Sequence, residues 1–378
     1  MKDSFEFYLP VNLIFGPGRL EVLGTEAVKY GKKVMIVTGR HSTKASGLLK
    51  RAGQLLEQAG AEVSVFDEAE PNPTASCVMR GAAAARQQGC QVIVGLGGGS
   101  IMDCSKAIAF AACNEGNIFD YIYGRKQGER ALPLILVPTT CGTGSEGNAF
   151  AVLTDDETKD KKALKSAAVI ARASIVDPEL MKTMPKSVLA SVGFDALCHC
   201  MEAYLSRSGS PVTDTLALEG IRLLAGHLPA VYRNYEDPEG WRCVTLASTL
   251  GGMVIGLAGT AAPHGLEHPA SGLRNITHGR GLAALTPVIF RRSIDAAPQR
   301  FCRISQSLGG ENEKDCVSRI LQLLEQIDLK TSLSREGVKP EDVEWMTENA
   351  LKVSQGNLNN HPRSFSREEI REIYEEAL

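Results

Sequence analysis

The sequence predicts two domains of different class: an α/β domain with a parallel sheet and flanking helices over residues 1–183, and an all-helical domain over residues 184–378. In the first half, short β-branched runs alternate with helical apolar spacing, the rhythm of a parallel sheet covered by helices. From about Pro185 onward, strand signals nearly vanish and long helical patterns dominate. A length of 378 residues also favours ~2 domains over one.

The elements follow in order along the chain. Strands are expected at residues 32–39, 61–67, 90–97 and 132–140, because each is a short run rich in Val, Ile or Leu. Helices are expected between them at residues 46–60, 78–89 and 100–113, where apolar residues recur at helical spacing. In the second domain the helical patterns cover residues 187–206, 211–228, 241–259 and 366–378. The acidic segments 341–350 and 367–378 are expected to turn a charged face to solvent.

Composition favours a globular enzyme and argues against several other classes. Of its residues, 43% are hydrophobic and 22% charged, which is ordinary for such a protein. Its net charge of −3 would not attract nucleic acid or an acidic membrane surface. No apolar run approaches the ~20 residues that span a bilayer, and the charged N-terminal segment does not look like a secretory signal. We therefore expect a cytoplasmic protein with no nucleic-acid or membrane partner.

The ten cysteines do not form an obvious metal site. Only Cys198 and Cys200 stand close together, in a helical segment where residues two apart point to different sides. Buried free thiols are the better interpretation, and they fit a reducing compartment.

Two glycine-rich loops follow two of the expected strands. Gly97–Ser100 is a GGGS turn that leads into a helix carrying Asp103 and Lys106, and Pro138–Glu146 reads PTTCGTGSE. Glycines let the backbone approach a bulky anion, and the exposed amides at a helix N-terminus favour negative charge. A single such loop could be only a tight turn. Two loops at the carboxyl edge of one sheet predict a dinucleotide site.

Metal-binding side chains cluster in the second domain. Asp195 and His199 are four residues apart in an apolar helical segment, so they share one helix face, and His264 and His268 repeat this spacing. His278 stands ten positions after His268, and the segment between them contains a proline and a glycine, enough for a turn back over the site. A carboxylate and imidazole shell suits Fe(II), Zn(II), Mn(II) or Co(II). The alternative is that these histidines merely form hydrogen bonds beside apolar helices.

These motifs together resemble the iron-containing (group III) alcohol dehydrogenase family. The matching segments run from VNLIFGPG near the start through PNPT, GLGGGSIMDCSKAIA, PTTCGTGSE, VLTDDETKDK, SIVDPEL and GFDALCHCMEAY to the three-histidine block. The resemblance implies a dehydroquinate synthase-like fold, a nicotinamide coenzyme and a cleft that holds it against the metal. It implies Fe(II), with Zn(II) as another occupant, bound by Asp195, His199, His264 and His278. The residues implied for the coenzyme are Asn72, Gly97, Gly98, Gly99, Ser100, Asp103, Thr139, Thr140, Thr143 and Lys161.

The chain departs from the family pattern at three positions. Leu282 stands where an asparagine is common after the last metal histidine, and Cys141 stands where alanine is usual. Gly39 stands where NAD-preferring relatives often have an aspartate. Because Arg40, Ser42, Thr43 and Lys44 follow, Gly39 is expected to contribute to a coenzyme site that accepts NAD(P), with NADP(H) preferred.

The function that the sequence predicts is reversible hydride transfer between a small alcohol or diol and NAD(P)+, giving an aldehyde or ketone. His268, which the resemblance places near the substrate, is our candidate for relaying the proton, because imidazole titrates near neutral pH. We also expect a homo-oligomer, a dimer or larger.

Other functions remain open at this stage. An NAD- and metal-dependent lyase of dehydroquinate synthase type would keep its NAD and turn over without a net absorbance change. A glycerol dehydrogenase-like zinc enzyme, or a catalytically silent binding protein on the same fold, is a further alternative.

Overall fold

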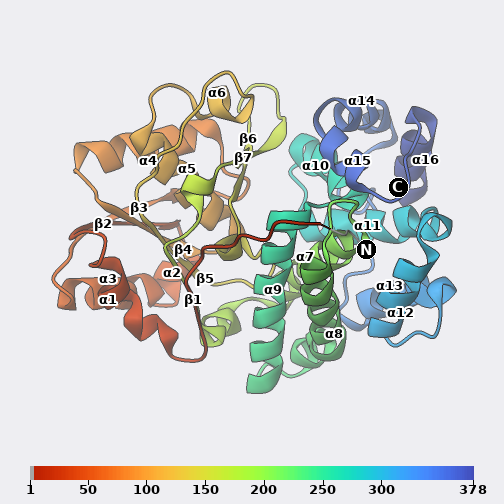
Figure 1. Ribbon diagram of the computed structural model, residues 1–378, viewed down its shortest axis with the longest axis horizontal. Coiled ribbons are helices and arrows are strands. Elements are labelled where there is room, and N and C mark those ends of the chain that lie inside the picture. Colours follow the sequence, from red (N-terminus) through yellow and green to blue (C-terminus); the bar gives the residue numbers. More distant parts are fainter. Residues whose placement is uncertain (1–3) are drawn as a thin grey trace. The chain divides into compact units, whose positions relative to one another are not determined.

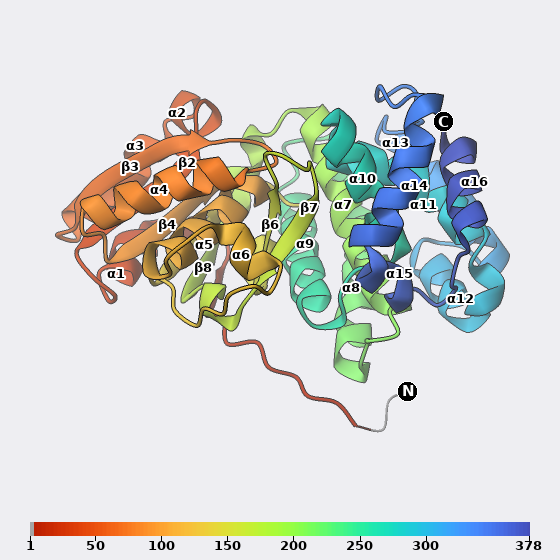
Figure 2. The same cartoon turned by 90° about the horizontal axis from the view of Figure 1, so that it is seen from above.

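The computed structural model describes residues 4–378, which divide into two compact units. One, here called the sheet unit, comprises Leu9–Thr140 and Ser145–Thr183. The other, the helical unit, comprises Met184–Leu378 together with Cys141–Gly144 and residues 4–8. Cys141–Gly144 thus lie with the helices, although the sequence analysis placed them in the first domain. Residues 4–12 run as an extended segment without helix or strand (Figure 2).

The core of the sheet unit is a parallel sheet of six strands, as the sequence predicts. Its order is β1 (Leu13–Phe15), β8 (Ala173–Val176), β5 (Leu134–Pro138), β4 (Val92–Gly97), β2 (Lys33–Gly39) and β3 (Glu62–Ala69). The predicted runs became β2 to β5, whereas the three- and four-residue strands β1 and β8 were not predicted. A separate antiparallel pair, β6 (Phe150–Thr154) and β7 (Lys161–Lys165), was also missed.

Helices cover both faces of this sheet (Figure 1). One face packs on α4 (Ala75–Gln87), α5 (Gly99–Cys113) and α6 (Ile118–Ile122), through side chains such as Met35 and Leu136. The other face packs on α1 (Leu23–Ala27) and α3 (Leu48–Gln58), through Ile36 and Val137 among others. A four-residue helix, α2 (Ser42–Ala45), follows β2. Because β4 and β5 are buried on both faces, their sequences are continuously apolar rather than alternating.

The strand order reverses between β2 and β4. From β2 the chain crosses by α3 to β3 at the edge of the sheet, then returns by α4, on the opposite face, to β4 beside β2. The loops that leave the carboxyl ends of β2 and β4 therefore diverge to opposite faces. Open α/β sheets bind ligands at such a switch point, so the fold places Gly39 and Gly97 at the expected edge.

A buried lysine fixes the segment that follows β5. Lys106 of α5 has no exposed surface, and its ammonium donates hydrogen bonds to Ser145 O (2.6 Å), Ser145 Oγ (2.8 Å), Asn148 Oδ1 (3.1 Å) and Phe150 O (2.7 Å). Burial lowers the pKa of Lys106 to about 8. Four acceptors around one ammonium offset much of the cost of its burial. The network ties α5 to the start of β6.

The helical unit contains no strand among the residues that the structure describes, as the sequence predicts. Its helices are α7 (Lys186–Leu205), α8 (Pro211–Arg233), α9 (Pro238–Ala258), α10 (Ala262–Arg274), α11 (His278–Arg291), α12 (Pro298–Ser307), α13 (Cys316–Gln326), α14 (Val343–Val353), α15 (Gln355–Asn360) and α16 (Arg367–Ala377). Of these, α7 is central, since nearly every side chain from Leu189 to Leu205 is buried, and it packs on α8, α9 and α11.

Two helices of this unit, α7 and α9, are long and apolar enough to cross a membrane by length and composition alone. The sequence analysis expected no such run, and in this respect it was wrong. In the most apolar 18-residue stretch of each helix, the share that is buried within the protein is 89% for α7 and 67% for α9. Core helices of globular proteins have the same character, because a helix that is apolar all round is one that other helices surround.

Candidate metal centre

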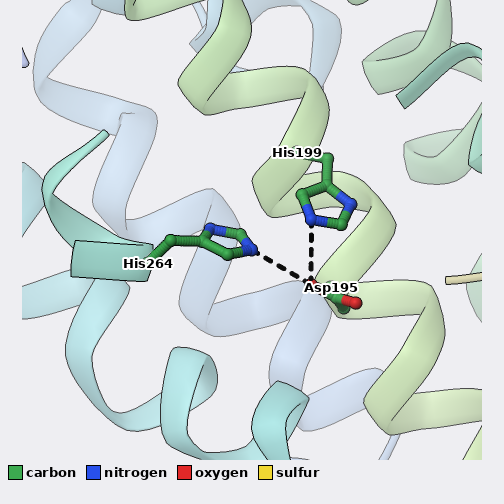
Figure 3. Close-up of side chains that lie close together, drawn as sticks. All are labelled: Asp195, His199 and His264. Carbon is green, nitrogen blue, oxygen red and sulfur yellow. Dashed lines mark ion pairs between the residues drawn. The ribbon is translucent and has the colours of Figure 1, made fainter. Parts of the chain in front are cut away.

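Four side chains from three helices of the helical unit bring their donor atoms to one point. Asp195 and His199 lie one turn apart on α7, His264 lies on α10, and His278 is the first residue of α11. Asp195 Oδ1 is 3.5 Å from His199 Nε2, 3.4 Å from His264 Nε2 and 3.6 Å from His278 Nε2. Figure 3 shows the first two of these approaches. The structure therefore unites the four residues that the sequence predicts as ligands.

The donor set fits a divalent metal ion. Asp195 Oδ1 and His264 Nε2 are buried without a hydrogen-bond partner, which is costly unless something else satisfies them. Ligand bonds of ~2.1 Å at tetrahedral angles hold two ligand atoms ~3.4 Å apart, close to the separations observed here. Three neutral imidazoles and one carboxylate would suit Fe(II) or Zn(II).

The neighbouring thiols face away from this point. Cys198 Sγ lies 3.5 Å from Thr286 Oγ1, and Cys200 Sγ lies 3.9 Å from Ala247 O. Burial raises the pKa of Cys200 to about 12, which opposes the thiolate form that a metal would need. All ten cysteines are free in the described structure, and these two behave as the buried thiols that the sequence predicts.

Two buried glutamates hold the far nitrogens of two of these histidines. Glu202 of α7 accepts a hydrogen bond from His264 Nδ1 through Oε1 (2.6 Å), and from the backbone amide of Ala261 through Oε2 (2.7 Å). Glu267 of α10 pairs in the same way with His278 Nδ1. With Nδ1 as the donor, each imidazole leaves Nε2 as a lone-pair donor for a metal. The sequence analysis missed both glutamates.

Burial and neighbouring charges act in opposite directions on the protonation of these side chains. Burial lowers the pKa of His199 to about 4. Burial also opposes protonation of His264, but the carboxylates of Glu202 and Asp195 outweigh it and raise the pKa to about 10. For Asp195, burial is the largest influence and disfavours the charged form, yet the three histidines together hold its pKa below the ordinary value. The site thus keeps its carboxylate charged and attracts positive charge.

His268 of α10 lies beside this donor set. Its ring is 5.7 Å from that of His278 in a stacked arrangement and 6.1 Å from that of His264, edge to face. Ligand atoms of Glu267, His268 and His278 also lie within 4.8 Å of one another. Its expected role in proton relay stays a prediction.

The residues predicted for the coenzyme phosphates lie together at the carboxyl edge of the sheet. Gly97 pairs with Pro138, and the amide of Thr139 donates to Gly97 O (3.0 Å). A Cβ on Gly98 would approach Thr140 Oγ1 to 3.0 Å, and one on Gly97 would meet Ile101 at 2.6 Å, so side chains would crowd the turn. Gly99 and Ser100 begin α5, whose N-terminus supplies amides that an anion can use.

Three other predicted coenzyme residues surround β6 and β7. Asn72 adopts a left-handed backbone (φ 51°), and the following Pro73 O accepts from the amide of Thr154, which pairs with Lys161. Asp103 is more constrained. Its carboxylate accepts from Ser145 Oγ (2.6 Å) and from the Val152 amide (3.0 Å), and burial raises its pKa. These bonds give Asp103 a part in fixing the loop.

Thr143 lies with the helical unit, unlike Thr139 and Thr140. A Cβ on its neighbour Gly144 would collide with Ser248 O and with Gly252 of α9, and one on Gly142 would meet Val192 of α7 at 2.6 Å. The glycines of PTTCGTGSE are therefore required for close backbone approach to helices as well as for a turn.

The charges after β2 already have partners. Arg40 pairs with Glu70 (2.9 Å) and Lys44 with Asp67, all at least 39% exposed at the side chain. Gly39 has room for a side chain, since a Cβ there would meet only Ile101 Cδ1 at 3.4 Å and Ala69 O at 3.6 Å. The sequence analysis treated Arg40 and Lys44 as available to a phosphate without considering these acidic residues of β3 and the loop after it.

Comparison with known proteins gives one consistent result over the whole chain. The model of the iron-containing alcohol dehydrogenases matches residues 10–178, and that of the C-terminal part of the Fe-containing alcohol dehydrogenase family matches residues 189–378. A 1,3-propanediol dehydrogenase of Klebsiella pneumoniae is 35% identical over 386 residues, with 99% of both chains covered. An NAD-dependent methanol dehydrogenase of Bacillus methanolicus is 31% identical, with 98% of this chain and 99% of the relative covered. The crystal structure of an archaeal halo-thermophilic alcohol dehydrogenase from a Red Sea brine pool has a TM-score of 0.95 at 33% identity, with both chains fully covered.

Replacing Asp195, His264 or His278 by alanine should abolish metal retention while leaving the fold, because a three-donor remnant binds a divalent ion far more weakly. Elemental analysis and circular dichroism of each purified variant measure the two effects. His227→Ala, which removes a partly exposed histidine of α8, serves as the control and should keep its metal. Full occupancy with normal turnover in the site variants would exclude these residues from the centre.

Replacing His268 by alanine should leave the metal bound but slow turnover by ~10²-fold or more and change the dependence of kcat on pH, because proton relay and ligation are separate roles. Steady-state kinetics between about pH 6 and 9, the range in which imidazole titrates, provide the measurement. Kinetics equal to those of the unmodified enzyme at every pH would indicate that His268 has only a structural role.

Proposed function

The chain belongs to the iron-containing alcohol dehydrogenase family and is a metal-dependent alcohol dehydrogenase, and we propose that it interconverts small primary alcohols or diols and their aldehydes with NAD(P) and Fe(II). The observation that carries this proposal is the convergence of three imidazole nitrogens on one buried carboxylate oxygen. The reaction balances as an alcohol and NAD(P)+ giving a carbonyl compound, NAD(P)H and a proton.

Asp195, His199, His264 and His278 would hold the ion, and Glu202 and Glu267 would fix two of the imidazoles. A divalent ion held by these residues would supply Lewis-acid chemistry, which lowers the pKa of an alcohol. The protein orients the substrate carbon toward the nicotinamide and limits access of water, while His268 carries the released proton outward.

A small substrate is supported by the names of the relatives, which act on 1,3-propanediol and methanol. The test is an anaerobic screen of the metal-loaded enzyme against short alcohols, diols and aldehydes with both coenzymes. Formation of NAD(P)H with an alcohol supports the proposal. Turnover with tightly held NAD and no net absorbance change would instead indicate a lyase of dehydroquinate synthase type, and failure to retain any metal would indicate a silent binding protein.

We also propose a cytoplasmic enzyme that acts as a homo-oligomer. Ten free thiols suit a reducing compartment, and the apolar helices α7 and α9 are mostly buried by other parts of the protein. The exposed aromatic side chains of Phe5, Phe7 and Tyr8 offer a surface that a second copy could cover.

Activity should be lost in air and regained with Fe(II) and a reductant, because the donor set contains no thiolate and exposes one of its histidines to solvent. Zinc is expected to occupy the site in some purified protein, since it binds N and O ligands more tightly than iron. Activity and elemental content measured on the same samples test this. Equal activity of an iron-free zinc form would refute the iron assignment while leaving the dehydrogenase one.

For the coenzyme, we propose that NADP(H) is accepted and preferred. Arg40 and Lys44 are paired with Glu70 and Asp67, but exposed ion pairs are worth only ~0–1 kcal/mol, so a doubly charged phosphate can displace the acidic partners. A Cβ at Gly39 makes only ordinary van der Waals contacts, so this position suits the introduction of an aspartate.

Gly39→Asp should therefore lower kcat/KM for NADP(H) by ~10-fold or more while sparing NAD(H), through repulsion of the 2′-phosphate. Gly39→Asn has nearly the same size without the charge and is the matched control, expected to lose much less. Initial rates with each coenzyme measure the ratio. A wild-type enzyme that ignores NADP(H), or equal effects of the two variants, would contradict the proposal.

A further inference from the structure

The metal histidines are not held equally firmly. The side chains of Asp195, His199 and His264 are only 4–5% exposed, whereas that of His278 is 25% exposed. His278 is also the first residue of its helix, where the backbone has fewer helical hydrogen bonds, and the preceding Thr277 makes no side-chain cap. Packing alone therefore restrains this ligand least.

Glu267 supplies the missing restraint from a neighbouring helix. It has no exposed surface, and its Oε2 accepts hydrogen bonds from His278 Nδ1 and from Ser271 Oγ (3.2 Å). Its Oε1 is buried without a hydrogen-bond partner in the described structure. Burying a carboxylate costs free energy unless a positive or hydrogen-bonding group pairs with it. The interaction with His278 therefore accounts for the buried position of Glu267.

The first turn of α11 is shaped to admit this carboxylate. A Cβ on Gly281 would lie 2.8 Å from both Cγ and Oε1 of Glu267 and 3.1 Å from Ile276 Cδ1. Glycine inside a helix is ~1 kcal/mol less favourable than alanine. Gly281 therefore provides the space through which the side chain of Glu267 reaches His278, and the two residues form a matched pair.

We infer that Glu267 is a positioning residue for the metal: it holds the imidazole of His278 in the orientation and tautomer that present Nε2, and Gly281 provides the room. This inference rests on the proposed metal-dependent function. A carboxylate on Nδ1–H makes the opposite nitrogen a better donor, and loss of such a partner typically weakens metal binding 10–100-fold. Glu202 serves His264 in the same manner but is reinforced by two backbone amides.

Co(II) binding to the apoprotein tests the inference without substrate or coenzyme. We expect Glu267→Gln, which keeps an acceptor but loses the charge, to weaken Co(II) binding ~10-fold by chelator competition, and Glu267→Ala to weaken it ~100-fold. Both should change the visible spectrum of the bound ion. Asp342→Asn, which breaks the ion pair of Arg274 at the end of the same helix, is the control and should bind Co(II) normally.

The double variant Glu267→Ala with Gly281→Ala separates positioning from packing, because the new methyl group occupies the space that the carboxylate leaves. We expect it to recover thermal stability relative to Glu267→Ala while Co(II) binding stays weak. Recovery of Co(II) affinity in the double variant, or unchanged affinity and spectrum in Glu267→Gln, would overturn the inference.

Two Co(II) ions per chain, with the second absent from Glu267→Gln, would also overturn it, by making Glu267 a ligand with His268 and His278. Because these measurements require only metal binding, they stay informative if the protein proves not to oxidise alcohols. Failure of the alcohol screen with normal Co(II) results would refute the proposed reaction and leave the positioning role intact.

Discussion

The arrangement of the helical unit depends on one constraint: a buried carboxylate oxygen must face three imidazole nitrogens at 3.4–3.6 Å. No pair of helices can meet it alone. One helix, α7, supplies the carboxylate and one histidine because positions four apart share a face. The other two histidines come from α10 and α11, which pack on each other and both on α7. Burying a carboxylate and three imidazoles together is unfavourable unless an ion binds them. The helical unit is therefore built to bind a metal as well as to pack its apolar side chains.

The sheet unit meets a different constraint, since two glycine-rich loops must lie together at the edge where we propose that the coenzyme phosphates bind. In-register pairing of β4 and β5 sets Gly97 beside Pro138, so that both loops leave the sheet at the same edge. The Lys106 network then fixes the chain just beyond the second loop. Rigid support allows a glycine-rich turn, which has high conformational freedom, to keep one conformation.

The features that sequence reasoning found are ones that neighbouring residues encode. The i, i+4 pair on α7 and the apolar runs of β2 to β5 are local, and all were predicted. The strands β1 and β8 were missed because three or four residues carry too little pattern. Glu202 and Glu267 were missed for another reason: a glutamate beside histidines along the chain looks like a solvated charge, and only tertiary packing shows that it is buried. Similarly, Glu70 lies thirty residues beyond Arg40, so the pairing that offsets the arginine is invisible to local inspection.

The unequal burial of the donors indicates from which side the centre works. A structural metal site is closed by protein ligands all round, whereas a catalytic site keeps one side open to a substrate. Here three donors are almost fully buried and solvent reaches the set at His278, beside which the partly buried His268 stacks. Under the proposed function, a substrate oxygen would approach on the His278 side, where the imidazole of His268 also stands. The same exposure leaves His278 with the least packing of the four donors, which explains why this ligand has a buried carboxylate of its own and a glycine that makes room for it.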